Sequence, residues 1–231
     1  MGPLAMDAPG HMALDEAILE LALPGTSFFR FYEWRGPAVT FGLAQPYALA
    51  LACAKASGMA CVPIVRRPTG GGVVFHDGDL TFSVVFPWER LSPALQVYER
   101  MHLGIREALA KRGVETSVAG FAGPPPLLAP PAGGGERSIC FDAPSPFDLL
   151  GGNGEKLLGG ALRRRKGQGL YQGSFRPERC RLPRRELEVA VAEGICAAWP
   201  GARPEPLDPA WFAAGERLAE KYGSAAWNKR R

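Results

Sequence analysis

The sequence lacks any apolar run long enough to cross a membrane, since no window approaches the roughly 18 consecutive apolar residues that a spanning helix needs. Its first 21 residues lack the basic start and apolar stretch of a signal peptide. The five cysteines form no Cys-x-x-Cys pair and no Cys/His metal spacing, and an odd number in 231 residues argues against a disulfide framework. We therefore expect a cytoplasmic protein with reduced thiols, no bound metal and no membrane anchor.

Strong charge is also missing. The net charge of +4 is much weaker than that of a dedicated nucleic-acid-binding domain, although it favours an acidic protein partner. With 46% hydrophobic and 22% charged residues, the composition is that of an ordinary globular chain, and no internal repeat is present. We expect one domain over residues 1–231 and no nucleic-acid partner.

Hydrophobic spacing and turn residues predict helices and strands mixed without strict βαβ alternation, which favours an α+β fold with a mixed or antiparallel sheet flanked by helices. Two β-rich runs around Arg35-Gly36 suggest a hairpin, and the runs at 61–66 and 79–86 suggest adjacent buried strands. Ser92 is expected to cap a helix that has Pro93 at its first position. The expected helices cover 11–23, 92–113, 187–199 and 208–223, and two or three strands lie within 156–175.

Residues 120–135 contain ten glycines or prolines among sixteen positions. This composition cannot continue a helix or a central strand. Strand-like segments resume on both sides, so we expect a mobile loop within the domain rather than a linker.

Three consecutive glycines, Gly70 to Gly72, follow Arg66-Arg67-Pro68-Thr69 between two expected strands. Such a turn lets a ligand lie directly against backbone N–H groups, and two flanking arginines favour an anion. No Gly-Lys-Ser/Thr follows, so the segment is not a P-loop. A plain hairpin turn is the alternative interpretation, and His76 beyond it is more often structural than catalytic.

Cys140 and Lys156 are candidates for reactive groups. Cys140 follows the Gly/Pro-rich loop and can present a thiolate, whereas Cys61 and Cys196 are expected to be packed; the alternative for any cysteine is a small buried residue. Lys156 starts a glycine-bracketed strand and can point a cation into a pocket or lie exposed in solvent. The basic run 163–166 is either a solvated turn or a docking face for an acidic protein.

Taken together, these segments resemble the catalytic domain shared by biotin ligases and lipoate ligases or transferases. The resemblance rests on residues 11–17, 31–34, 41–45, 66–72, 76–83, 154–159, 172–174, 221–223 and 227–228. It implies the class II aminoacyl-tRNA synthetase-like biotin/lipoate ligase catalytic fold. It also implies a monomer without a cofactor and without a C-terminal accessory domain.

Within that family, Cys140-Phe141-Asp142-Ala143-Pro144-Ser145 is similar to the element of cysteine-dependent octanoyltransferases and amidotransferases. The resemblance implies that Cys140 and Lys156 are catalytic. It also implies a set of substrate-binding residues, namely Arg67, Thr69, Gly70, Gly71, Gly72, His76, Gly159 and Gly173.

The implied activity is transfer of an octanoyl group from acyl carrier protein to the lysine of a lipoyl domain, through an acyl-enzyme on Cys140. Glycine cleavage H protein and dehydrogenase E2 subunits are the implied acceptors. Three alternatives stay open: an amidotransferase between lipoyl proteins, an ATP-dependent lipoate ligase, and a non-catalytic lipoate- or fatty-acid-binding homologue. The chain departs from the family pattern at His11, Gly160, Leu162 and Tyr171-Gln172, and the changes at Leu162 and Tyr171-Gln172 keep the last alternative open.

Overall fold

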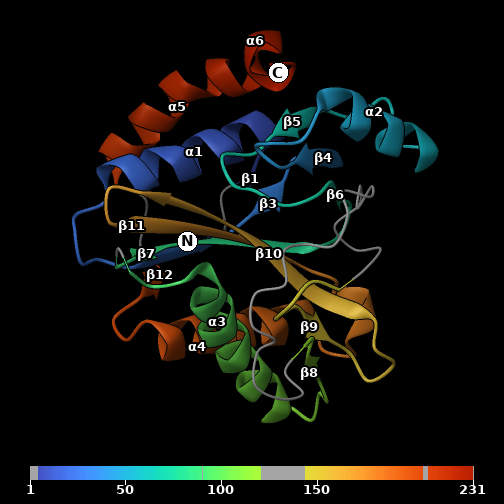
Figure 1. The fold of residues 1–231 in the computed structure, drawn as a ribbon, viewed down its shortest axis with the longest axis vertical. Coiled ribbons are helices and arrows are strands. Elements are labelled where there is room, and N and C mark those ends of the chain that lie inside the picture. The colour runs from blue at the N-terminus through green and yellow to red at the C-terminus, as the bar shows by residue number, and fades with distance from the viewer. Residues whose placement is uncertain (1–4, 90, 121–143, 205–207, 231) are drawn as a thin grey trace.

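The computed structural model describes residues 5–89, 91–120, 144–204 and 208–230. A seven-stranded sheet runs through the centre of the molecule (Figure 1). β12 pairs with β2 in parallel and the other neighbours pair antiparallel, so the sheet is mixed. The strand order is β12 (Arg203–Pro204), β2 (Phe28–Phe31), β7 (Leu80–Pro87), β11 (Gln168–Phe175), β10 (Lys156–Arg165), β9 (Leu149–Leu150) and β8 (Ser117–Val118).

Helices cover both faces of this sheet (Figure 1). On one face lie α1 (Ala8–Leu21) and α5 (Pro209–Gly223), and on the other lie α3 (Ala94–Ala110) and α4 (Arg184–Ala198). Short helices η1 (Pro177–Arg179) and α6 (Ala225–Asn228) follow β11 and α5. The α+β fold with a mixed sheet flanked by helices is as the sequence predicts. None of the described helices is long and apolar enough to cross a membrane.

The strands are buried on both sides because each face supplies its own core. Phe82, Phe86 and Tyr171 pack under α3 and α4, whereas Val85 and Leu170 pack under α1 and α5. Residues i and i+2 of a strand share a face, so β7 alternates between the two cores. Burial of both faces explains why β7 is apolar along most of its length.

A three-stranded sheet packs beside the main one, in the order β5 (Ile64–Arg66), β4 (Ala38–Phe41) and β6 (Val74–His76). α2 (Tyr47–Ala56) covers it through a separate apolar cluster. β1 (Ala5–Met6) and β3 (Glu33–Trp34) form a further parallel pair. The glycine turn, residues 67–73, therefore connects β5 to β6 at the border between the two larger sheets.

Two predicted strand pairings are wrong. β2 and β4 do not form a hairpin about Arg35-Gly36, because β2 joins β7 in the main sheet while β4 joins the small one. β5 and β7 are likewise not neighbours. In both cases local sequence marked the strands correctly, but their partners are set by contacts with distant segments.

The observed helix boundaries agree with the predicted ones more closely than the strand pairings do. Asp208 caps α5 as predicted, its side chain accepting from Ala210 N at 2.7 Å. α3 begins after Pro93, which is itself the capping residue, so the predicted cap at Ser92 is wrong by one position. α2 is not predicted, because Pro46 offers no capping side chain and its run of alanines and leucines has no clear polar stripe. Of the expected loop at 120–135, everything after Gly120 lies outside the described residues.

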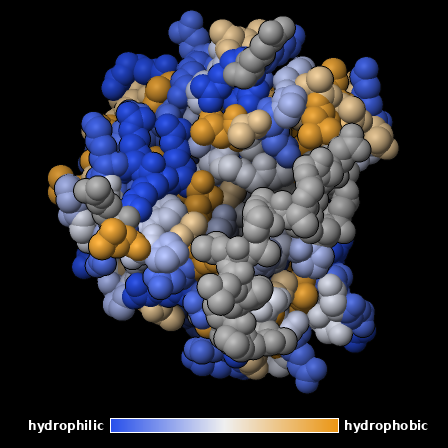
Figure 2. Space-filling view, viewed as in Figure 1, coloured by the Kyte–Doolittle hydropathy of each residue, from blue (hydrophilic) through white to orange (hydrophobic). Residues whose placement is uncertain are grey.

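Hydrophilic residues gather on one side of the face in Figure 2, over the left ends of α1 and α5 and the turn between β10 and β11. The basic run 163–166 ends β10 at this turn. Arg163 lies 3.3 Å from Glu16, and Arg165 lies 2.6 Å from Glu20. The run is therefore partly neutralised by acidic residues of α1.

Candidate active site

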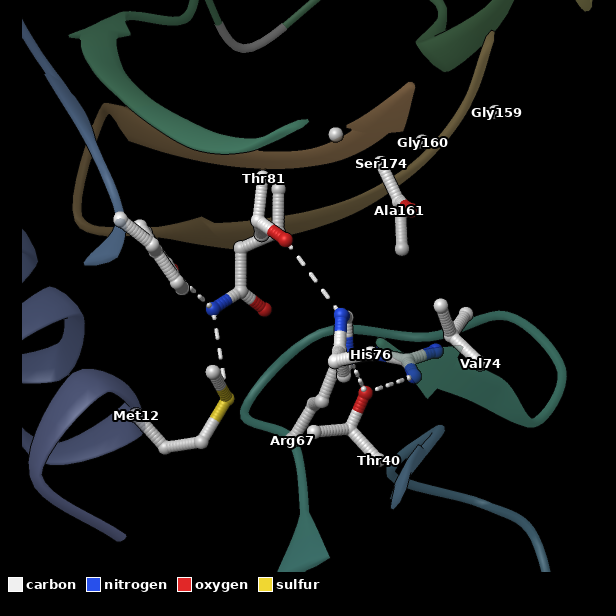
Figure 3. Close-up of a pocket in the computed structure, with 13 residues that line it drawn as sticks. Met12, Thr40, Arg67, Val74, His76, Thr81, Gly159, Gly160, Ala161 and Ser174 are labelled. Atoms are coloured by element: carbon white, nitrogen blue, oxygen red, sulfur yellow. Dashed lines mark hydrogen bonds between the residues drawn. The ribbon is translucent and has the colours of Figure 1, made fainter. Parts of the chain in front are cut away.

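A narrow cavity, with about 30 Å³ of room for the centre of a water molecule, lies between the glycine-rich middle of β10 and β11 and the edge of the small sheet (Figure 3). Apolar atoms dominate its wall, with a few polar groups at defined points. The lining residues are Met12, Tyr32, Thr40, Arg67, Val74, His76, Thr81, Gly159, Gly160, Ala161, Gln172, Gly173 and Ser174.

Glycines form the floor of this cavity for a packing reason. A Cβ atom on Gly160 would come within 2.3 Å of the Tyr171 ring, and one on Gly173 within 2.6 Å of Phe82. Both aromatic side chains fill the far side of the sheet, so no side chain fits at either glycine. The two glycines thus leave room for the rings that support the cavity floor from the far side of the sheet.

A hydrogen-bonded chain of four side chains forms the opposite wall. Arg67 Nη1 donates to Thr40 Oγ1 at 2.9 Å, and the Thr40 hydroxyl lies 2.8 Å from His76 Nε2. Arg67 can only donate, so the Thr40 oxygen accepts from it. The Asp79 carboxylate can only accept, so His76 Nδ1–H donates to its Oδ2 at 2.9 Å. Figure 3 shows Arg67, Thr40 and His76 grouped together.

Asp79 ends that chain as a buried carboxylate. Its Oδ2 also accepts hydrogen bonds from Thr81 at 2.7 Å and Ser174 at 2.6 Å. Burial alone would raise the pKa of Asp79, but His76 and the two hydroxyls hold it below the usual value. His76, Thr81 and Ser174 thus present fixed polar groups to the cavity.

A second carboxylate, Asp15 on α1, anchors the other side of the cavity. It pairs with Arg30 at 2.7 Å and accepts hydrogen bonds from Tyr32, Ser83 and Gln172. The Gln172 amide nitrogen donates to Asp15 at 2.6 Å and its oxygen accepts from Thr69 at 2.7 Å. Gln172 is therefore held at both ends.

His11 closes this cluster. Its ring stacks on Tyr32 at 4.2 Å and lies 2.9 Å from the Glu33 carbonyl oxygen. Burial, helped by the charge of Arg30, lowers the pKa of His11 to about 2. His11 is therefore neutral at physiological pH and serves to pack and orient Tyr32, which lines the cavity.

Lys156 is buried at the end of the floor. Its Nζ lies 2.8 Å from Asp148 Oδ2, and a Cβ on Gly159 would come within 2.6 Å of that Nζ. Burial raises the pKa of Asp148, while Lys156 opposes the rise. The glycine at 159 leaves room for the lysine side chain, so the ammonium group lies beside a residue that lines the cavity.

The predicted substrate-binding residues divide into three groups. Four line the cavity: Arg67, His76, Gly159 and Gly173. Thr69 lies behind the wall and bonds Gln172. Gly70, Gly71 and Gly72 are not among the lining residues.

The glycine turn is instead built into the scaffold. Gly70 N donates to the Leu162 carbonyl at 3.4 Å, and Gly71 packs directly against Gly42. Arg67 Nη2 donates to the carbonyl oxygens of Gly70 and Gly72, both at 2.8 Å. The turn is therefore a rigid support for the cavity wall.

Arg66 does not support the predicted anion site. Its guanidinium group is stacked on Phe41 at 4.7 Å and donates to main-chain carbonyl oxygens. The acceptors are Leu43, Gln45, Trp227, Asn228 and Arg230. It is a structural residue that fastens the C-terminal segment to the small sheet.

Cys140, the predicted nucleophile, lies outside the described residues, and the chain is described again from Pro144. Among the other cysteines, Cys53 and Cys180 are buried, Cys196 is half-buried and Cys61 is exposed. The packing expected for Cys61 is thus wrong, because it precedes β5 in a turn. The described residues contain no cluster of three His, Cys, Asp or Glu that could hold a metal ion.

Three polar residues that line the cavity, Thr81, Gln172 and Ser174, were not among the predicted site residues. Thr81 and Ser83 share one face of β7, next to Ser174 and Gln172 on the same face of β11. Polar residues at i and i+2 in otherwise apolar, buried strands are the signal that marks this face, since buried polar groups need partners.

Residues 7–176 match the family model of the lipoyl protein ligase A/B catalytic domain. The chain belongs to this family. It is 36% identical over 174 residues to the octanoyltransferase LipM of Symbiobacterium thermophilum, which covers 72% of this chain and 60% of that protein. It is 30% identical over 261 residues to the octanoyltransferase LipM of Staphylococcus aureus, covering 94% and 92%. The chain spans about three fifths of the length of the first of these relatives.

Solved structures share the fold. A lipoate-protein ligase A bound with ATP superposes with a TM-score of 0.77 at 21% identity, covering 99% of this chain and 97% of that one. A bi-partite lipoate protein ligase from Thermoplasma acidophilum gives 0.74 at 20% identity, covering 99% and 96%. The predicted lipoate-ligase catalytic fold is confirmed.

Proposed function

We propose that this protein is an acyltransferase that moves an octanoyl group from acyl carrier protein to the lysine of a lipoyl domain. The observation that carries the proposal is the similarity, at 30–36% identity, to proteins named octanoyltransferase LipM. Cys140 in its Cys-Phe-x-x-Pro-Ser element supplies the nucleophile that this chemistry needs. The acceptors are lipoyl proteins such as glycine cleavage H protein or dehydrogenase E2 subunits, and the reaction takes place in the cytoplasm.

In the first step the Cys140 thiolate attacks the carbonyl carbon of the octanoyl thioester. A new carbon–sulfur bond forms, the bond to the donor sulfur breaks, and the donor leaves as a thiolate that takes up a proton. The exchange of one thioester for another is nearly balanced in energy and needs no cofactor. Lys156 lies beside Gly159 at the cavity floor and stabilises the oxyanion of the intermediate as a charged hydrogen-bond donor.

In the second step the amine of the target lysine attacks the acyl-enzyme. The amide bond forms, the carbon–sulfur bond breaks, and the amine loses a proton as the Cys140 thiol is restored. The product amide is more stable than the thioester, so this step drives the transfer forward.

The apolar wall of the cavity suits an acyl chain. Met12, Val74 and Ala161 line it together with the glycine floor. Each methylene group buried there contributes about 0.8 kcal/mol to binding. The polar wall at Thr40, His76 and Thr81 then marks one end of the slot for the oxygen-bearing part of a ligand.

A donor panel tests the proposal. The protein is incubated with an apo lipoyl domain and one of three donors: octanoyl-acyl carrier protein, an octanoylated lipoyl domain, or octanoate with ATP. Octanoylation of the acceptor with the first donor alone supports the proposal. Transfer only from the octanoylated domain identifies an amidotransferase, transfer only with ATP identifies a ligase, and no transfer identifies a binding protein.

A further inference from the structure

A buried pair, His102 on α3 and Tyr171 on β11, lies beneath the cavity floor and has no role in the mechanism above. Both side chains are fully buried. The Tyr171 hydroxyl lies 2.7 Å from His102 Nε2. A Cβ atom added to Gly160 would lie only 2.3 Å from the same hydroxyl oxygen. Two polar groups are thus placed in an apolar core, which is costly unless both are satisfied.

The pair has a defined direction. The other ring nitrogen, His102 Nδ1, lies within hydrogen-bond distance of the Phe147 carbonyl oxygen, which can only accept. Nδ1 therefore carries the proton, and Nε2 accepts from Tyr171. Burial lowers the pKa of His102 to about 4, so the ring is neutral at physiological pH and keeps this tautomer.

The carbonyl held in this way belongs to a strained residue. Phe147 has a φ of 69°, in a region that non-glycine residues rarely adopt. Such backbone strain persists only where surrounding contacts enforce it, and it is concentrated at functional sites. His102 supplies one of those contacts.

The next residue connects this turn to the cavity. Asp148 accepts a hydrogen bond from Ser145 N at 2.5 Å and pairs with Lys156 Nζ at 2.8 Å. Since Phe147 and Asp148 are adjacent, fixing the Phe147 carbonyl also fixes where the Asp148 carboxylate lies. The contacts therefore run from Tyr171 through His102, Phe147 and Asp148 to Lys156.

We infer that His102 and Tyr171 are positioning residues that hold the ammonium group of Lys156 at the cavity floor by fixing the 145–148 turn. What Lys156 does once positioned rests on the proposed function. The positioning itself is a property of the folded chain.

Four variants test it. His102→Leu removes both hydrogen bonds, whereas His102→Asn keeps an amide N–H that can reach the Phe147 carbonyl. Tyr171→Phe removes only the hydroxyl and keeps the ring in place against Gly160. Tyr222→Phe is the matched control, because it also removes a buried hydroxyl, one that lies 3.0 Å from Glu16 on the far face of the sheet.

The first readout needs no activity. Each full-length variant is treated with an amine-acetylating reagent, and the modification rate of Lys156 is measured by peptide mass relative to exposed Lys55. Lys156 is only 3% exposed, so it is protected in the native chain. The second readout is the kcat and KM for octanoyl transfer, measured well below the unfolding temperature of each variant.

We expect His102→Leu to raise the Lys156 modification rate about tenfold and to lower kcat by a similar factor, with the donor KM nearly unchanged. Tyr171→Phe should also raise the Lys156 modification rate and lower kcat. His102→Asn should keep most of the protection of Lys156 that His102→Leu loses. Unchanged protection of Lys156 in folded Tyr171→Phe and His102→Leu, or equal loss in Tyr222→Phe, would overturn the inference. Loss of protection in a protein whose wild type transfers no octanoyl group would support positioning while rejecting the proposed function.

Discussion

A Cβ atom on Gly42 would lie 2.0 Å from the carbonyl oxygen of Gly71. The end of β4 and the glycine turn are therefore in direct backbone contact. Since the turn leads from β5 to His76 on β6, this contact sets the position of one cavity wall.

Gly42→Ala should displace the turn, because the overlap is with backbone atoms that cannot rotate away. Overpacking of this kind costs about 1–3 kcal/mol of unfolding free energy, which urea denaturation measures. Gly36→Ala is the control, since a Cβ there meets nothing within 4 Å. Equal unfolding free energies for the two variants would show that the glycine turn can shift to accommodate the Cβ atom without loss of stability.

Asp15→Asn tests the buried carboxylate on α1. The change leaves Arg30 without its ion-pair partner and places an amide N–H₂ against Gln172, so we expect a loss of about 3–5 kcal/mol in unfolding free energy. Glu20→Gln breaks a partly exposed pair with Arg165 and should cost less than about 1 kcal/mol. A small effect for Asp15→Asn would mean that the cluster is hydrated and not a structural anchor.

Stability should fall between pH 7 and pH 5. In that range the unfolded chain protonates His11 and His102 near pH 6.5, while the folded chain does not, because their pKa values are about 2 and about 4. The unfolded state therefore binds more protons as pH falls, and each histidine removes about 2 kcal/mol of stability.

Denaturation of wild type and His102→Asn at the two pH values checks this prediction. Asparagine does not titrate, so the variant should lose about half of the pH dependence. Identical pH dependence in the two proteins would indicate that His102 is protonated in the folded state.

Arg66→Lys should release the C-terminal segment. A lysine cannot reproduce the planar set of donors that Arg66 directs to carbonyls on both sides, including Trp227 and Asn228. Losing two or more such bonds costs about 2 kcal/mol, and carboxypeptidase should then trim residues 227–231 faster. Arg35→Lys, which affects one exposed bond to Ala5, should leave the trimming rate unchanged.

How much the sequence reveals depends on whether a feature is local. The cap of α5 at Asp208 and the strands β10 and β11 follow from local spacing and turn residues, and they are found as predicted. The strands that pair with β2 and β4 are not the predicted ones, because pairing depends on where strands distant in sequence bury their faces.

The candidate site shows the same division. Lys156, Arg67 and His76 stand in recognisable local motifs, and they lie at or beside the cavity. Gln172 lies there too, but its importance depends on Asp15 and Thr69, which are far from it in sequence. The structural role of Arg66 was hidden for the same reason, since its acceptors come from the end of the chain.

The proposed transfer depends on an acyl-enzyme at Cys140, which the intact mass of the protein after incubation with octanoyl-acyl carrier protein detects. We predict a gain of one octanoyl group, located by peptide mass on Cys140, lost in Cys140→Ala and retained in Cys61→Ala, which removes an exposed thiol. The absence of any adduct, or the same adduct in Cys140→Ala, would rule out an acyl-enzyme at Cys140.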